Sequence, residues 1–149
     1  MNDLDFMRLA LQEAEQALHS GDVPIGAVAA YRGAVIGTGY NRREADHDPT
    51  AHAEMLAIRA AAAHLGHWRL DEVTLYCTLE PCAMCAGAMV LARLPRLVYA
   101  AVDLKAGAAG SVMDVCRHDK LNHRIDVQGG FMADKAAEQL HTFFRSLRT

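Results

Sequence analysis

The sequence predicts an α/β fold in which a central mixed sheet of about five strands carries helices on both faces. Three observations support this: a helical apolar repeat opens the chain, two β-type runs follow it, and later strands alternate with helical segments. Helices that lie between strands favour such layers. With 149 residues, 52% of them hydrophobic, the chain can bury a proper core, and we expect one domain over residues 1–149.

The first forty residues predict a helix followed by a hairpin. Apolar residues recur at helical spacing from Met7 to Leu18, and Gly21 can end that helix in a left-handed conformation. The runs "IGAVAAY" and "AVIGTGY" predict two strands, joined by a tight turn at Arg32–Gly33. The polar stretch "NRREADHDPT" then predicts a loop.

The middle of the chain predicts a helix, a strand and a second helix. Thr50 can cap a helix that begins with "AHAEMLAIR" and ends at Gly66. The run "EVTLYCT" alternates as a strand does. Pro81 suits the first turn of the next helix, where a missing N–H costs nothing, and we expect that helix to reach about Arg93.

The last third predicts two more strands and a closing helix. "RLVYAAV" predicts a strand, and "RIDVQGG" a weaker one. The C-terminal helix is predicted from Ala133 to Leu147, with apolar residues on one face.

Two short motifs in this framework carry chemistry. "HAE" places His52 and Glu54 at the start of one predicted helix, and "PCAMC" places Cys82 and Cys85 at the start of the next. A helix N-terminus lowers a thiol pKa, and thiolate is the form that binds zinc. Cysteines three residues apart share one helical face. His52, Cys82 and Cys85 are therefore candidate zinc ligands.

The number of ligands separates a catalytic site from a structural one. A structural zinc site normally has four protein ligands, whereas a catalytic site has three and a water with a pKa near ~7. No fourth ligand is evident, because Cys77 and Cys116 stand apart from the motif and are expected in the core. A redox Cys-x-x-C pair and a structural zinc module that binds RNA or protein remain alternatives. The redox pair explains neither His52 nor Glu54, and the structural module would need a fourth protein ligand.

The pattern H-x-E…P-C-x-x-C resembles the zinc nucleobase deaminases. The stretches "NRREADHDPTAHAEMLAIR", "TLYCTLEPCAMCAGAM" and "DLKAGAAGSVMDV" together resemble the bacterial tRNA-specific adenosine deaminases, over most of the chain. The resemblance implies a cytidine-deaminase-like three-layer α/β/α fold, a homodimer, and one Zn²⁺ per subunit. It also implies conversion of adenosine to inosine at the wobble position of an arginine tRNA.

The resemblance implies a role for Glu54 as the catalytic proton shuttle. Glu54 would take a proton from the attacking water, protonate N1 of adenine, and later pass a proton to the departing amine. Zinc chemistry alone does not choose the substrate, so a deaminase of free cytidine, deoxycytidylate or guanine on the same fold remains the alternative function.

Three residues are candidate substrate contacts. Asn41 leaves a strand beside the HAE loop and can bond the nucleoside, although a turn asparagine is nearly as good an interpretation. Asp103 follows a strand and can accept from a ribose 2′-hydroxyl, or else pair with Lys105. Lys105 opens a basic segment that could hold phosphates around the anticodon loop: Lys105, Arg117, Lys120, Asn122, His123 and Arg124.

Composition and hydropathy predict the cellular compartment of the protein. The net charge of −3 gives no global sign of nucleic-acid binding, so any basic surface must be local. No apolar run approaches the ~20 residues of a membrane span, and the N-terminus does not resemble a signal peptide. We therefore expect a cytoplasmic protein without a membrane partner, in which the cysteines stay reduced.

Overall fold

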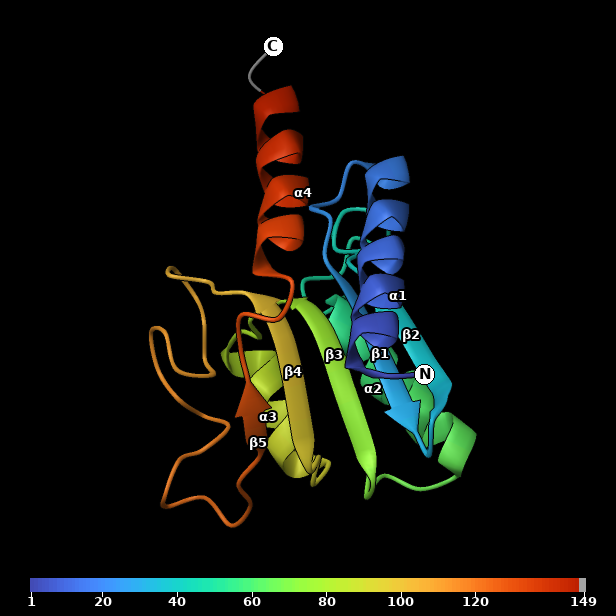
Figure 1. The fold of residues 1–149 in the computed structure, drawn as a ribbon, viewed down its shortest axis with the longest axis vertical. Helices are drawn as coiled ribbons and strands as arrows, with labels where there is room; N and C mark the ends of the chain where they lie inside the picture. The colour runs from blue at the N-terminus through green and yellow to red at the C-terminus, as the bar shows by residue number, and fades with distance from the viewer. Residues whose placement is uncertain (148–149) are drawn as a thin grey trace.

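A computed structural model describes residues 1–147 and confirms the mixed α/β fold (Figure 1). One sheet has the strand order β2-β1-β3-β4-β5. β1 pairs antiparallel with β2 and β3, whereas β3, β4 and β5 run parallel. The strands are β1 (Gly26–Tyr31), β2 (Ala34–Tyr40), β3 (Val73–Leu79), β4 (Arg96–Ala101) and β5 (Asp126–Gln128).

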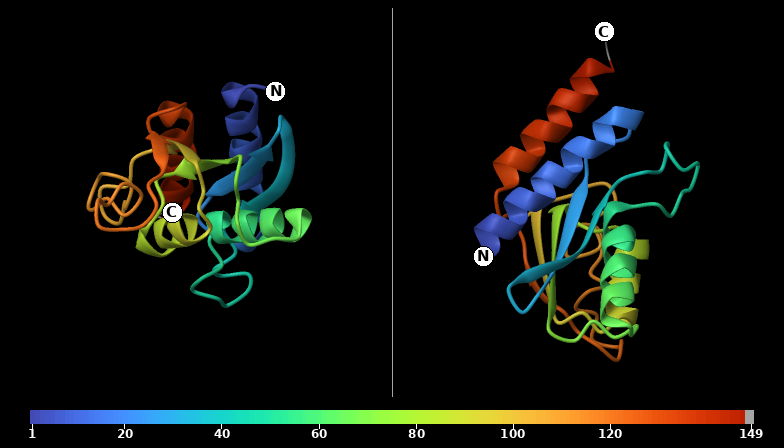
Figure 2. Two further views of the ribbon diagram at one scale, coloured as in Figure 1. Left: turned by 90° about the horizontal axis from the view of Figure 1, so that it is seen from below. Right: turned by 90° about the vertical axis from the view of Figure 1, so that its right-hand side faces the viewer.

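Helices cover both faces of this sheet. Figure 2 shows α2 and α3 on one face and α1 and α4 on the other. Residues 148–149, the end of the predicted domain, lie outside the described part. The helices are α1 (Asp3–Gln16), a short 3₁₀ turn η1 (Ala17–Ser20), α2 (Ala53–Leu65), α3 (Ala83–Leu91) and α4 (Ala133–Ser146).

The core has one part on each face of the sheet. Val73, Leu75 and Cys77 point from β3 toward α2 and α3, as the alternation in the sequence predicts. Tyr76, on the opposite face of the same strand, packs with α1. Cys116 is also fully buried, so both cysteines outside the motif are core residues, as predicted.

Two glycines bring α2 against the edge strand β2. A Cβ atom on Gly37 would lie 2.6 Å from the carbonyl oxygen of Ala57, and one on Gly39 would lie 2.3 Å from that of Ala53. Both distances are shorter than any real Cβ contact, so only glycine permits this packing. The close approach fixes the N-terminal turn of α2, where His52 and Glu54 stand.

Local signals placed the turn correctly but misplaced two helix starts. Arg32 and Gly33 both have positive φ, as a tight hairpin turn requires. Thr50 does not cap α2: its hydroxyl bonds to Asp48, and the N-cap is His52. The N-cap of α3 is Cys82, so Pro81 precedes the helix instead of standing in its first turn. That helix ends at Leu91, slightly earlier than expected.

Candidate active site

The two predicted motifs meet at the N-termini of α2 and α3. The Nδ1 atom of His52 lies 3.6 Å from Sγ of Cys82 and 3.5 Å from Sγ of Cys85. All three candidate ligand atoms lie within 4.8 Å of one another. Residues that are about thirty positions apart in the sequence therefore form one compact cluster.

The spacing of this cluster fits a tetrahedral zinc ion. Bonds of about 2.3 Å to sulfur and 2.0–2.1 Å to nitrogen separate tetrahedral ligand atoms by roughly 3.5–3.8 Å. The two sulfur–nitrogen distances are of this size. One imidazole nitrogen and two thiolates are also a donor set that zinc prefers.

Electrostatics makes Cys82 the first thiolate of the pair. A hydrogen bond from Cys85 and another from His52 lower the pKa of the Cys82 thiol to about 3. The shared hydrogen bond with Cys82, together with burial, raises the pKa of Cys85. A divalent cation favours the deprotonated form of both sulfurs, because metal binding releases thiol protons.

Glu54 lies beside the cluster in the first turn of α2. The side chain is 4% exposed, and burial raises its pKa to about 7, with the nearby His52 acting in the opposite direction. A carboxyl group with a pKa near neutrality can both accept and donate a proton under working conditions. This is the property that a proton shuttle needs.

A cavity of about 160 Å³ opens onto these residues. Its polar groups converge from four places in the chain: the end of β2, the N-terminus of α2, the turn before α3 and the segment after β4. The lining residues are Val23, Ile25, Asn41, Arg43, His52, Ala53, Glu54, Leu79, Glu80, Cys82, Asp103 and Ala106.

The three predicted substrate contacts differ in position. Asn41 lines the cavity but already donates to the carbonyl of Val23 and accepts from the backbone N–H of Arg43. Asp103 also lines it, and its Oδ1 accepts from the backbone N–H groups of Lys105 and Ala106. Lys105 is exposed and is not part of the lining.

Two members of the basic segment are occupied within the protein. Arg117 pairs with Asp114 at 2.9 Å and donates to the carbonyl of Ala109. The Nε2 atom of His123 lies 2.7 Å from the carbonyl oxygen of Leu94. Lys105, Lys120, Asn122 and Arg124 remain exposed.

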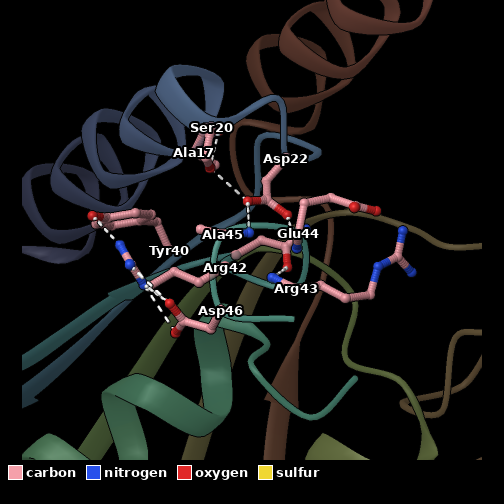
Figure 3. A network of polar contacts seen from close by, with 10 residues as sticks. Ala17, Ser20, Asp22, Tyr40, Arg42, Arg43, Glu44, Ala45 and Asp46 are labelled. Atoms are coloured by element: carbon pink, nitrogen blue, oxygen red, sulfur yellow. Dashed lines mark hydrogen bonds and ion pairs between the residues drawn. The ribbon is translucent and has the colours of Figure 1, made fainter. Parts of the chain in front are cut away.

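Sequence reasoning missed Arg43 and the buried acid that holds its loop. The carboxylate of Asp22 is 1% exposed and accepts from the backbone N–H groups of Glu44 and Ala45 and from the hydroxyl of Ser20 (Figure 3). Burial alone would raise the pKa of Asp22, but these hydrogen bonds lower it below its usual value. The only signal was an acid directly before a buried strand.

The loop sends its two arginines in opposite directions, as Figure 3 shows. Arg42 forms an ion pair with Asp46 at 2.9 Å and donates to the hydroxyl of Tyr40 at 2.8 Å. Arg43 instead lines the cavity and is exposed. Its guanidinium is therefore available at the rim of the site.

Glu80 stands directly before Pro81, in the turn that leads to α3. The side chain is 1% exposed, and its carboxylate accepts hydrogen bonds from Asp103, Ala109 and Ser111. Burial by itself would raise the pKa of Glu80, but the bonds from Ser111 and from the backbone lower it. Glu80 therefore joins the turn before α3 to the segment after β4.

Comparisons with known proteins agree with this geometry. The sequence matches the MafB19-like deaminase family over residues 1–148. A tRNA-specific adenosine deaminase of Streptococcus pyogenes is 46% identical over 143 residues, 96% of this chain and 90% of the relative. One of Bacillus subtilis is 44% identical over 143 residues, 96% of this chain and 89% of the relative.

Solved structures give the same picture. One from studies of A-to-I editing by tRNA deaminases at the wobble position has a TM-score of 0.87 and 45% identity, covering 91% of this chain and 99% of that one. The X-ray structure of guanine deaminase from Bacillus subtilis has a TM-score of 0.67 and 34% identity, covering 99% of this chain and 94% of that one. The same fold therefore serves both an RNA substrate and a free base.

Proposed function

The chain belongs to the MafB19-like deaminase family and, within it, to the tRNA-specific adenosine deaminases, and from this premise we propose that it converts adenosine to inosine at the wobble position of a tRNA anticodon. The expected substrate is an arginine tRNA. The observation that carries the proposal is the buried Glu54 beside the His52, Cys82 and Cys85 cluster, where Glu54 lines the cavity.

The residues that would hold Zn²⁺ are His52, Cys82 and Cys85. When bound there, zinc supplies a Lewis acid that lowers the pKa of a coordinated water toward ~7. Within residues 1–147, these three side chains form the one cluster that could hold a metal ion, and no fourth side chain joins it. Three protein ligands leave room for water, which favours catalysis over a structural role.

Glu54 moves the protons of the reaction. Its carboxylate takes a proton from the attacking water and delivers it to N1 of adenine as the new C–O bond forms at C6. It then moves the second proton from that oxygen to the exocyclic nitrogen, and ammonia leaves as the C6–N bond breaks. Water and adenosine give inosine and ammonia, and Glu54 ends in its starting state.

The remaining cavity residues would orient the nucleoside. Asp103 uses Oδ1 for its own turn, and its Oδ2 makes no hydrogen bond within the described residues. That oxygen can accept from a ribose 2′-hydroxyl, which DNA lacks. Asn41 holds the cavity wall, and Lys105 would meet phosphate outside the cavity.

The proposal includes a cytoplasmic homodimer. Leu91, the last residue of α3, is 71% exposed. It belongs to the apolar stretch "CAGAMVLARL" (residues 85–94), which could form the dimer interface. Sedimentation should give a dimer for the wild type and a shift toward monomer for Leu91→Glu.

Within residues 1–147, no helix is long and apolar enough to cross a bilayer.

The test of the function is product analysis. Purified protein is incubated with the cellular tRNA pool, and the RNA is sequenced for inosine, with Glu54→Ala as the inactive control. Parallel reactions with free guanine, cytidine and deoxycytidylate are assayed for ammonia. Inosine confined to a wobble position supports the proposal. Ammonia released from free guanine, cytidine or deoxycytidylate, with the tRNA unmodified, would instead support the alternative function, a deaminase of free substrates.

The metal is tested separately. Metal analysis should give one zinc per chain, and chelation should remove deaminase activity that added zinc restores. X-ray absorption should report two sulfurs, one nitrogen and a lighter exchangeable ligand. A zinc ion held by four side chains would contradict the catalytic assignment.

A further inference from the structure

Glu80 gathers hydrogen bonds from one loop only. Its Oε1 accepts from the backbone N–H of Asp103 at 3.1 Å and from the hydroxyl of Ser111. Its Oε2 accepts from the backbone N–H groups of Ala109 at 3.0 Å and Ser111 at 3.1 Å. Both oxygens are thus used by residues 103–111, which we call the 103–111 loop.

The contact between this loop and the turn before α3 is unusually close. The backbone N–H of Ala108 donates to the carbonyl of Pro81 at 2.8 Å. A Cβ atom on Gly107 would lie 2.5 Å from the carboxyl carbon of Glu80 and 2.5 Å from the carbonyl oxygen of Asp103. No larger residue fits there without displacing one of them, so the glycine and the carboxylate depend on each other.

The charge of Glu80 is balanced by hydrogen bonds alone. Within residues 1–147, no lysine or arginine forms an ion pair with it. A buried charge is costly unless its hydrogen bonds are satisfied, and apolar replacements are often equally stable. Stability alone therefore gives a weak reason for a carboxylate here.

The two ends of the 103–111 loop are anchored differently. Ala108 and Ala109 are buried in the core, whereas the end that begins at Asp103 has little apolar packing. Leu104 is 81% exposed, and Val102, just before the loop, is 52% exposed, so apolar packing does not hold this stretch. Ala106, which lines the cavity, is also exposed. At this end of the loop, the hydrogen bond from the backbone N–H of Asp103 to Glu80 joins the cavity wall to the turn before α3.

We propose that Glu80 is a positioning residue that sets the distance between the cysteine turn at Cys82 and the opposite cavity wall at Asp103 and Ala106. It reaches the wall through the backbone of the 103–111 loop and does not touch the reacting atoms. The proposal rests on the proposed function for its substrate. Its structural part concerns the loop alone and can be tested without substrate.

The central variant is Glu80→Gln, which keeps the shape but replaces one acceptor oxygen by a donor that faces backbone N–H groups. Hydrogen exchange should show lost protection at the amides of Asp103, Ala109 and Ser111, while β3 amides keep theirs. Zinc content should remain that of the wild type. Unchanged protection at these three amides would overturn the proposal, whatever the substrate is.

Kinetics then tests the effect on the site. With an anticodon stem-loop, Glu80→Gln should raise KM by about tenfold and lower kcat less, because contacts common to ground and transition states are lost. The preference for ribose over 2′-deoxyribose at the target nucleotide should shrink. Wild-type KM and an unchanged ribose preference in the zinc-loaded variant would also overturn it.

A matched control separates positioning from general loss of stability. Val28→Ala leaves a cavity between α1 and the sheet, on the opposite face, and should lower the melting temperature without changing KM or ribose preference. If Glu80→Gln does not fold, Ser111→Ala is the milder variant: it removes only the hydroxyl that donates to Oε1 of Glu80 and keeps the backbone N–H that donates to Oε2. It should show the same pattern at smaller size. Normal exchange and kinetics in Ser111→Ala would then contradict the proposal. The two proposals can fail separately. If the wild type is inactive on tRNA but Glu80→Gln shows the expected loss of hydrogen-exchange protection, only the proposed function is contradicted.

Discussion

The Oδ1 atom of Asp22 accepts a 2.6 Å hydrogen bond from the backbone N–H of Glu44, and this bond ties the segment before β1 to the loop after β2. The same loop places Arg43 at the rim of the cavity and Asn41 in its wall. A buried carboxylate at one end of the sheet therefore determines where two cavity residues lie.

Replacing Asp22 by asparagine should loosen this loop. The amide keeps one acceptor oxygen but presents a donor to the N–H of Glu44 or Ala45, which leaves a buried group unsatisfied at a cost of about 1–3 kcal/mol. We expect a loss of this size in the free energy of unfolding, measured by urea titration. We also expect a several-fold rise in KM for the anticodon stem-loop.

Asp46→Asn is the matched control on the same loop. Its ion pair with Arg42 is partly exposed, with side chains 36% and 39% accessible, so its loss should change the free energy of unfolding little and leave KM unchanged. If both variants behaved alike, the burial of Asp22 would not be the property that matters.

Glu54→Gln should separate proton transfer from metal binding. The amide cannot carry protons between water, N1 and the leaving amine, so kcat should fall by roughly 10²–10⁴-fold. His52, Cys82 and Cys85 are unchanged, so zinc content measured by metal analysis should be that of the wild type. Normal turnover in this variant would show that another group moves the protons.

Asp103→Asn tests the predicted ribose contact. The amide oxygen can still accept from the backbone of the Asp103–Ala106 turn, but the charged acceptor for the 2′-hydroxyl is lost. The ratio of kcat/KM for RNA over a matched DNA hairpin should fall by about tenfold, as for a charge-assisted hydrogen bond of ~1.5 kcal/mol. An unchanged ratio would assign RNA preference to other residues.

The order of helices and strands could be predicted because it depends on local periodicity. The meeting of His52, Cys82 and Cys85 in one candidate metal cluster could also be predicted, since these residues belong to short motifs of fixed spacing. The exact helix starts depend on tertiary geometry: Pro81 remained outside α3 because Cys82 takes the N-cap position.

Two buried acids that hold the cavity residues in place, Asp22 and Glu80, could not be predicted, because their hydrogen-bond partners are remote in the sequence. Glu80 bonds to residues 23 to 31 positions away, and nothing in its neighbours indicates those contacts. The places of Lys105 and Ala106 depend on a local turn in the same way. Asp103 accepts from the N–H groups of both Lys105 and Ala106, and the resulting turn brings Ala106, not Lys105, to the cavity.

Away from the site, Asp3 joins α1 to the sheet and should make stability depend on pH. Its carboxylate accepts from Arg96 at 2.8 Å and 3.0 Å and from the hydroxyl of Tyr76 at 2.5 Å. The bonds to Arg96 and then to Tyr76 lower the pKa of Asp3 to about 2. Its side chain is 34% exposed, so solvent screening reduces the stabilisation to about 1 kcal/mol.

The sign follows from the direction of the shift. Because the pKa is lower in the folded state than its unfolded value near ~3.9, the stabilisation is complete above pH ~4 and is lost as the pH falls toward 2. Asp3→Asn should therefore be less stable than the wild type at pH 7, and the difference should shrink between pH 4 and pH 2.

Urea titrations between pH 7 and pH 2 measure this difference in the free energy of unfolding. Asp71→Asn is the control, since the ion pair of Asp71 with Arg69 is largely exposed and its loss should give a small, nearly constant difference. A gap between wild type and Asp3→Asn that stayed constant down to pH 2 would mean that the carboxylate contributes by its shape and not by its charge.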